Sequence, residues 1–220
     1  MLVTILDLHI GEKKEILNLG QTTKKANENM GRSVPFTRSY WVVPGKFLAG
    51  CYPGSENKDK AHKKLKGLLD HGIRNIINLM EPDEINWNRK PFFPYEARME
   101  SIAESMGVDV TFKRIPIRDM RTSSRNEMIE ILDRIEQSIE NGKPIYIHCW
   151  GGRGRTGTVV GCYLARHGYA SGQKIIEFIK DLRKKYRRSQ SAFSRNIGAN
   201  RYGILLGRGR IKGINQVSID

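Results

Sequence analysis

Residues 144–157, PIYIHCWGGRGRTG, constrain the fold of this chain more than any other segment. The segment begins with an apolar run rich in β-branched and aromatic residues, which is typical of a buried strand. Four glycines follow between positions 151 and 157, and a helical pattern of apolar residues resumes after Arg155. A strand, a glycine-rich loop and a helix in this order point successive backbone N–H groups at one place, where the helix N-terminus adds partial positive charge. We therefore expect this loop to hold a phosphate group.

Cys149 and Arg155 flank the loop, with five residues between them. A thiol is a weak nucleophile until it ionises, and a helix N-terminus that binds phosphate also stabilises a thiolate. We therefore expect Cys149 to be a thiolate at neutral pH. Arg155 supplies a planar guanidinium that binds two phosphate oxygens at once, which a lysine ammonium does not. Thr156, just inside the helix, can point its hydroxyl at the sulfur and ease its later departure.

Other phosphate-binding loops share parts of this pattern. The glycines at 152–157 match the GxGxxG fingerprint of dinucleotide-binding folds, but that fold also needs a second β-strand with an acidic residue about 20 positions on. Here a second helical pattern follows instead, and the two arginines of the loop suit a phosphate dianion better. A Walker-type loop is excluded because no Gly-Lys-Ser/Thr ends the run. A bare Cys-x5-Arg is a weak signal in an arginine-rich chain, so the prediction depends on the whole constellation.

The run HCWGGRGRTG at 148–157 resembles the HCxxGxxR[ST]G signature of the cysteine-dependent protein tyrosine phosphatases. The short chain resembles their dual-specificity branch, and the resemblance extends from Tyr40 to about Arg188. It implies a phosphatase-type fold and phosphomonoester hydrolysis through a cysteinyl-phosphate, with no metal or organic cofactor. His148, just before the nucleophile, is expected to order the loop by hydrogen bonding and to help to keep the thiol ionised; the alternative is a core histidine with no such effect. The resemblance assigns phosphate binding to Trp150, Gly151, Gly152, Arg153, Gly154 and Arg155.

The leaving oxygen needs a proton, and a positioned acid contributes roughly 10² to 10⁴ in rate. The family uses an aspartate on a loop before the signature, and Asp119, thirty positions ahead of Cys149, is our candidate. The neighbouring Arg118 and Arg121 favour its ionised form, as they would for an ordinary exposed carboxylate, whereas a bound phosphate dianion acts in the opposite direction. The less favoured candidates are Asp109, expected on a strand, and Asp133, expected on the outer side of a helix.

The chain departs from the family pattern in two places. No Trp-Pro-Asp stands in the acid loop, which fits the dual-specificity branch better than the classical tyrosine-specific one. The residue that positions the attacking water has no clear match, although Gln190 lies in roughly the right region.

The remaining pattern predicts a three-layer α/β fold with a mostly parallel central sheet flanked by helices, and the site at the carboxyl ends of the strands. Strands are expected within 39–50, as two short strands joined by a Pro-Gly turn, and at 73–79, 108–117 and 144–148. Helices are expected at 59–71, at 95–106, after a Ser124/Glu127 capping box, and from Arg155 onward. The acidic loop at 81–84 reads as a solvated turn that could also flank the site.

Domain boundaries follow from the same pattern. Residues 1–38 read as an N-terminal extension, residues 39–188 as the catalytic domain, and residues 189–220 as a basic tail that either packs on the domain or extends from it. Within the extension, residues 2–19 form a hairpin or an ill-ordered segment, and residues 21–33 read as a polar linker.

Charge and cysteine content limit the partners and the cellular compartment to be expected. A net charge of +15 attracts polyanions, with much of the excess in 180–188 and the tail, although solubility alone would explain such a surface. Three cysteines argue against a disulfide framework and for a reducing compartment, the cytoplasm. No apolar run is long enough to span a membrane, and the first residues lack the features of a signal peptide.

The substrate class stays open at this level. A phosphorylated protein, on tyrosine or on serine and threonine, is the family default. Arg153 resembles a basic residue of some lipid and inositol phosphatases, which makes an inositol phosphate or a phosphoinositide the main alternative. RNA 5′-triphosphate removal is a third reading. A basic module that binds phospho-ligands or nucleic acid with a vestigial site is the non-enzymatic alternative, and it is disfavoured because the nucleophile, the arginine and an acid are all present.

Overall fold

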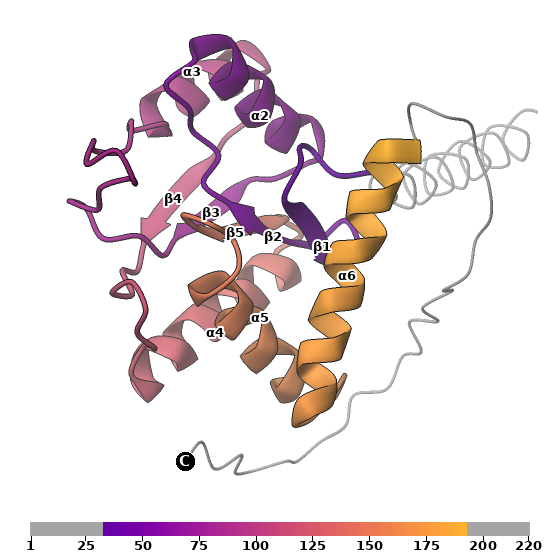
Figure 1. Ribbon diagram of the computed structural model, residues 1–220. Coiled ribbons are helices and arrows are strands. Elements are labelled where there is room, and N and C mark those ends of the chain that lie inside the picture. The colour runs from indigo at the N-terminus through magenta and orange to yellow at the C-terminus, as the bar shows by residue number, and fades with distance from the viewer. Residues whose placement is uncertain (1–32, 193–220) are drawn as a thin grey trace, which may run out of the picture.

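A computed structural model describes residues 33–192, with side chains as far as Tyr186 (Figure 1). The expectations for residues 1–32 and 193–220 lie outside the described part of the chain. Residues 33–38, which the sequence assigns to the extension, lie against the domain: Phe36 packs on the core, and the indole of Trp41 donates to the Ser33 carbonyl at 2.8 Å. The last described helix runs to Ala192, past the predicted boundary at 188.

A five-stranded sheet forms the centre of the molecule, in the order β1-β2-β5-β3-β4. β1 (Ser39–Val43) and β2 (Phe47–Cys51) form the expected antiparallel pair around the Pro-Gly turn. From β2 onward all neighbours are parallel: β5 (Ile145–Cys149) lies between β2 and β3 (Asn75–Asn78), and β4 (Thr111–Arg114) forms the far edge. The mostly parallel sheet is therefore confirmed.

Helices cover both faces of this sheet, as predicted (Figure 1). α2 (Lys58–Asp70) and α3 (Glu96–Ser105) lie on one face. α4 (Arg125–Glu140), α5 (Arg155–Arg166) and α6 (Gln173–Ala192) lie on the other. None of these described helices is long and apolar enough to cross a membrane.

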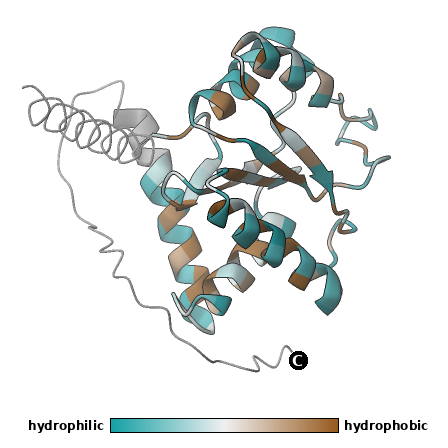
Figure 2. Cartoon of the chain, turned by 180° about the vertical axis from the view of Figure 1, so that it is seen from behind, coloured by the Kyte–Doolittle hydropathy of each residue, from teal (hydrophilic) through white to brown (hydrophobic). Residues whose placement is uncertain are grey.

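Burial explains why the sequence of the central strand is apolar throughout. All five residues of β5 are buried, since helices cover it above and below. Along the surrounding helices, hydrophobic residues alternate with hydrophilic ones, brown and teal in Figure 2, as expected of helices with one face on the sheet. The strand therefore fixes Cys149, its last residue, inside the fold and at the carboxyl edge of the sheet.

Local signals set the helix starts and one strand end. The Ser124/Glu127 capping box is present at α4, with both reciprocal hydrogen bonds formed. β4 is shorter than the predicted strand at 108–117, although the N–H groups of Ile115 and Ile117 still donate at 3.0 Å each to the carbonyls of Asn78 and Leu79, where β3 ends. The chain then turns away as the loop that carries Asp119.

Candidate active site

The loop after β5 has its carbonyl groups bound on the outside. The Trp150 carbonyl accepts from the backbone N–H of Tyr52 at 3.0 Å, and the Gly151 carbonyl accepts from the Arg38 guanidinium at 2.9 Å. Because each peptide unit points its N–H opposite to its carbonyl, an outward carbonyl turns the following N–H toward the interior of the loop.

Arg183 of α6 completes this outer ring. Its guanidinium donates to the carbonyls of Gly152 and Arg153, at 3.2 and 3.1 Å, and lies over the ring of Tyr40 at 5.4 Å. Neither Arg183 nor Arg38 was singled out from the sequence, because they are about 30 and more than 100 positions away from the residues they contact. A basic helix after the signature was the only available signal.

Gly152 is required by the packing of the loop on the sheet. Its φ is +70°, and a Cβ there would lie 2.5 Å from the backbone carbon of Gly50 on β2. A side chain is therefore excluded both by conformation and by space. Gly154 differs, since a Cβ would meet nothing within 4 Å.

The N-terminus of α5 is open to a ligand. Gly154 is the N-cap residue and supplies no side-chain hydrogen bond to the first turn, so these backbone donors are not capped by a side chain. An anion in the loop would meet these donors together with the positive end of the helix.

Arg155, the first residue of α5, is held by two carboxylates. Glu84 binds it in a bidentate pair, with N–O distances of 2.6 and 2.7 Å, and Asp119 lies 3.2 Å from the same guanidinium. The Ile117 carbonyl accepts a further bond at 3.2 Å. Burial alone lowers the pKa of Arg155, but the hydrogen bonds and charge of Glu84, with smaller contributions from Cys149 and Asp119, raise it overall. The guanidinium is therefore a fixed cation beside the thiol.

Glu84 is the residue whose role the sequence analysis underestimated. We expected the acidic loop at 81–84 to be a solvated turn with a second possibility of flanking the site, and the structure supports that second possibility. The Glu84 side chain is 8% exposed and pairs with a guanidinium 71 positions away. The available signal was its place directly after a core strand, at the edge where parallel strands end.

Asp119, our candidate for the acid, lies beside Arg155. Its side chain is 53% exposed, and its carboxylate is 3.2 Å from the Arg155 guanidinium. A tight turn shapes this loop: the Arg121 N–H donates to the Arg118 carbonyl at 3.0 Å, and Met120 has a φ of 59°. The other two candidates lie elsewhere, since Asp109 is exposed ahead of β4 and Asp133 pairs with Arg166 on the outer side of α4.

Cys149 ends β5 and is 3% exposed. It is among the groups that raise the pKa of Arg155, so the sulfur and the guanidinium lie on the same side of the fold. Across the parallel pair, Cys51 of β2 is its register partner, and burial raises the pKa of the Cys51 thiol. All three cysteines of the chain are free, and the third, Cys162, is half-buried on α5.

His148 is fully buried and neutral. Burial lowers its pKa to about 3, and its imidazole hydrogen-bonds the Tyr95 hydroxyl at 2.7 Å. A neutral ring orders the strand but adds no positive charge beside the sulfur, so the expected electrostatic help to the thiolate is not available. Thr156 is also buried, and its hydroxyl has no hydrogen-bond partner among the described residues, so its role toward the sulfur stays a prediction.

Aromatic side chains surround Trp150, the residue after the cysteine. The Trp87 ring lies 4.9 Å from it and the Phe92 ring 5.4 Å, and Phe92 also packs edge-on against Tyr52. Arg153 is exposed at the mouth of the loop. The loop therefore carries an aromatic cluster at Trp150 and an exposed guanidinium at Arg153.

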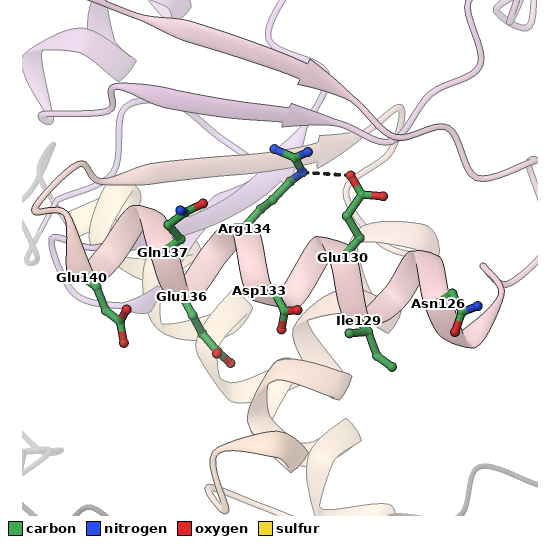
Figure 3. Close-up of a pocket in the computed structure, with 8 residues that line it drawn as sticks. All are labelled: Asn126, Ile129, Glu130, Asp133, Arg134, Glu136, Gln137 and Glu140. Carbon is green, nitrogen blue, oxygen red and sulfur yellow. Dashed lines mark hydrogen bonds and ion pairs between the residues drawn. The ribbon is translucent and has the colours of Figure 1, made fainter.

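A separate groove follows the outer face of α4 (Figure 3). It contains none of the loop residues, and its charges are largely paired, with Arg134 bound to Glu130 at 2.9 Å. The groove is lined by Asn126, Ile129, Glu130, Asp133, Arg134, Glu136, Gln137 and Glu140.

A mostly parallel α/β sandwich whose central strand ends in a Cys-x5-Arg anion loop defines a protein of the tyrosine phosphatase fold. A solved structure of this class, the kinase-associated phosphatase with serine in place of its catalytic cysteine, is similar to the chain. Their TM-score is 0.52 at 19% identity, over 76% of this chain and 99% of the other.

A family model described as a polymorphic toxin system DSP-PTPase phosphatase matches residues 52–169, and the chain belongs to this family. The predicted resemblance to the dual-specificity branch is thereby confirmed.

Curated relatives cover the same part of the chain. The mouse dual specificity protein phosphatase CDC14A is 32% identical over 145 residues, which are 64% of this chain and 21% of that protein. The mouse protein tyrosine phosphatase domain-containing protein 1 is 27% identical over 143 residues, 64% of this chain and 19% of that protein. The Arabidopsis thaliana phosphatidylglycerophosphate phosphatase PTPMT2 is 30% identical over 124 residues, 56% and 49% of the two chains. The chain thus spans about a fifth of the length of the first two relatives.

Proposed function

We propose that the protein hydrolyses phosphomonoesters through a cysteinyl-phosphate, as a dual-specificity or tyrosine protein phosphatase. The observation that supports this most directly is the guanidinium of Arg155, fixed beside Cys149 at the mouth of an uncapped helix. Backbone donors at a helix N-terminus beside a guanidinium favour an anionic ligand.

The reaction proceeds in two steps. The Cys149 sulfur attacks phosphorus, the bond from phosphorus to the leaving oxygen breaks, and Asp119 gives its proton to that oxygen. Water then attacks the cysteinyl-phosphate, Asp119 takes a proton from it, and the sulfur leaves as a thiolate with the hydroxyl of Thr156 donating to it. Arg155 and the backbone donors from Trp150 onward bind the phosphate oxygens in both steps.

The experiment uses full-length protein and radiolabelled phosphopeptide, quenched in acid during turnover. We expect labelled protein in the wild type and none in Cys149→Ser, with Cys162→Ser as the matched control because that thiol lies half-buried on α5 outside the loop. Turnover or labelling that survives in Cys149→Ser would refute the mechanism.

A phosphoinositide or inositol phosphate is the second candidate substrate. Arg153 is exposed at the loop mouth without an ion pair among the described residues, and two plant relatives are named phosphatidylglycerophosphate phosphatases. Arg153→Ala should then lower hydrolysis of inositol phosphates more than that of phosphopeptides, with Arg125→Ala on α4 as the control. An equal loss on both substrates would remove this candidate.

We further propose that the enzyme acts in the cytoplasm and that its basic C-terminal region contacts polyanions. The free thiols support a reducing compartment, where a thiolate nucleophile persists. Fractionation of the native cells would test this location, and recovery in an oxidising compartment would contradict it.

A further inference from the structure

Four large apolar side chains are exposed around the phosphate loop. Trp87 is 88% exposed, Met120 93%, Phe93 53% and Ile85 51%. A soluble domain seldom presents so many such residues around one site without a partner for them. We call these four residues the apolar rim.

Each member of the apolar rim contacts the site or directly follows a residue that does; Phe93, for example, follows Phe92, whose ring packs against Trp150. Ile85 follows Glu84 and Met120 follows Asp119, the two carboxylates that hold the same guanidinium. The Trp87 ring packs against Trp150, which follows the cysteine. The rim therefore borders the site on two segments, the loops that follow β3 and β4, and is not a scatter of unrelated surface residues.

The loop that carries three of these residues is braced. Ile85 and Pro91 form a backbone bridge, and the Asn86 N–H donates to the Lys90 carbonyl at 2.8 Å, which closes the tip as a tight turn. At its base the Tyr52 hydroxyl donates to the carbonyl of Phe93. In Figure 1 this loop, after β3, projects from the body of the protein at the carboxyl edge of the sheet. Its apolar side chains are held outward by backbone structure.

Cations accompany the rim. Arg89 and Lys90 are exposed at the tip of the loop, and Arg118 and Arg121 flank Met120. None of these four cations forms an ion pair with a described residue. Exposed tryptophan, phenylalanine and aliphatic side chains interspersed with unpaired arginine and lysine match the boundary of an anionic bilayer, which offers acyl chains beneath negative headgroups.

We propose that the apolar rim docks the protein on anionic phospholipid surfaces, with Trp87 and Phe93 in the interface and Arg89 and Lys90 on the headgroups. A single-stranded nucleic acid would also use aromatic faces and cations, but Ile85 and Met120 have no π face on which a base could stack. This docking goes beyond the proposed hydrolysis and does not depend on it, because no member of the rim takes part in the chemistry.

The test is sedimentation of full-length protein with phosphatidylcholine vesicles, with and without phosphatidylserine. We expect binding that needs phosphatidylserine and weakens with salt. Trp87→Ala should lower the partition coefficient roughly tenfold, by loss of its apolar area. Arg89→Ala with Lys90→Ala should lower it roughly thirtyfold at low salt. The matched controls, Ile129→Ser on α4 and the pair Lys60→Ala and Lys63→Ala on α2, should bind as the wild type does.

A second measurement separates docking from catalysis and from misfolding. Cys149→Ser should bind vesicles like the wild type, although it is inactive, so a failure of the proposed function leaves this result unchanged. Tryptophan emission should shift to the blue on vesicles, and Trp87→Phe should remove most of the shift, since Trp41 is already buried and Trp150 is half-buried against Phe92. Three results would each overturn the proposal. The first is no binding to vesicles, and the second is an equal loss of binding in the Ile129 or lysine controls. The third is that Trp87→Ala loses binding to single-stranded RNA while its vesicle binding stays intact.

Discussion

Glu84 and Asp119 contact one guanidinium, yet the first side chain is 8% exposed and the second 53%. This difference predicts that neutralising the two carboxylates will have opposite consequences for stability and for chemistry. The informative pair of variants is Glu84→Gln and Asp119→Asn, because each keeps the size of the side chain and removes its charge.

The magnitudes follow from the contacts. Glu84 makes two hydrogen bonds to Arg155, at 2.6 and 2.7 Å. Bonds to a charged group contribute about 1.5–3 kcal/mol each, and glutamine keeps a single neutral acceptor worth about 1 kcal/mol. Glu84→Gln should therefore lower the free energy of unfolding by about 2–5 kcal/mol, in line with other buried pairs that lose one partner. Solvent screens the exposed Asp119 pair, so Asp119→Asn should cost less than about 1 kcal/mol.

The rate of catalysis should depend on the leaving group in Asp119→Asn and not in Glu84→Gln. Asp119→Asn should slow alkyl phosphates by roughly 10² to 10⁴ and aryl phosphates with good leaving groups far less, because only the former need a proton on the departing oxygen. Glu84→Gln should slow both substrates by the same factor, since it displaces the phosphate-binding guanidinium. Urea unfolding and kcat/KM for one alkyl and one aryl phosphate test the pair. Equal losses of stability in the two variants, or a leaving-group dependence in Glu84→Gln, would refute the reasoning.

Three further predictions concern the loop and its strand. Gly152→Ala should lower the free energy of unfolding by at least about 2 kcal/mol through strain at positive φ and the clash with β2, whereas Gly154→Ala should change it little. Equal stabilities of the two variants in urea denaturation would contradict the close packing of Gly152 on β2. Arg183→Met should raise the inhibition constant of vanadate at least tenfold, because two loop carbonyls lose their donor, and Arg183→Lys should restore part of the affinity. An effect no larger than that of the exposed Lys184→Met would show that Arg183 does not orient the loop. His148→Gln should flatten the dependence of stability on pH between roughly pH 5 and 6.5. The pKa of His148 is about 3 in the folded protein, so the unfolded chain takes up the proton first, and wild-type stability falls with falling pH by up to about 1.4 kcal/mol per pH unit. Parallel slopes of the two proteins in urea titrations would show that the imidazole titrates normally.

The sequence predicted most of what is local in this protein. The strand, loop and helix at 144–157, the capping box of α4 and the Pro-Gly turn are each specified by residues within one or two turns of one another, so neighbours alone determine them. The alternation of strands and helices then left few topologies, since parallel crossovers share one hand. Asp119 could be proposed because it stands on the loop that follows the last strand before the signature, which is β4 at the edge of the sheet.

What escaped prediction is what the tertiary fold brings together. Glu84 reaches Arg155 across 71 positions, and Arg38 reaches Gly151 across 113. No periodicity encodes such pairs, and an acidic turn or a basic helix has the same composition whether or not it touches a site. The sequence likewise left the charge state of His148 open, because its neighbours in the chain say nothing of the complete burial that keeps the imidazole neutral.

The loop from Glu84 to Phe93 joins two roles within ten positions of the chain. Its first residue must keep its carboxylate to orient the guanidinium, while the side chains that follow face outward and meet few internal demands. Evolution can therefore exchange the tip freely but cannot change where it begins. Related proteins with new targets should therefore retain an acidic residue at position 84 and differ in the residues that follow it.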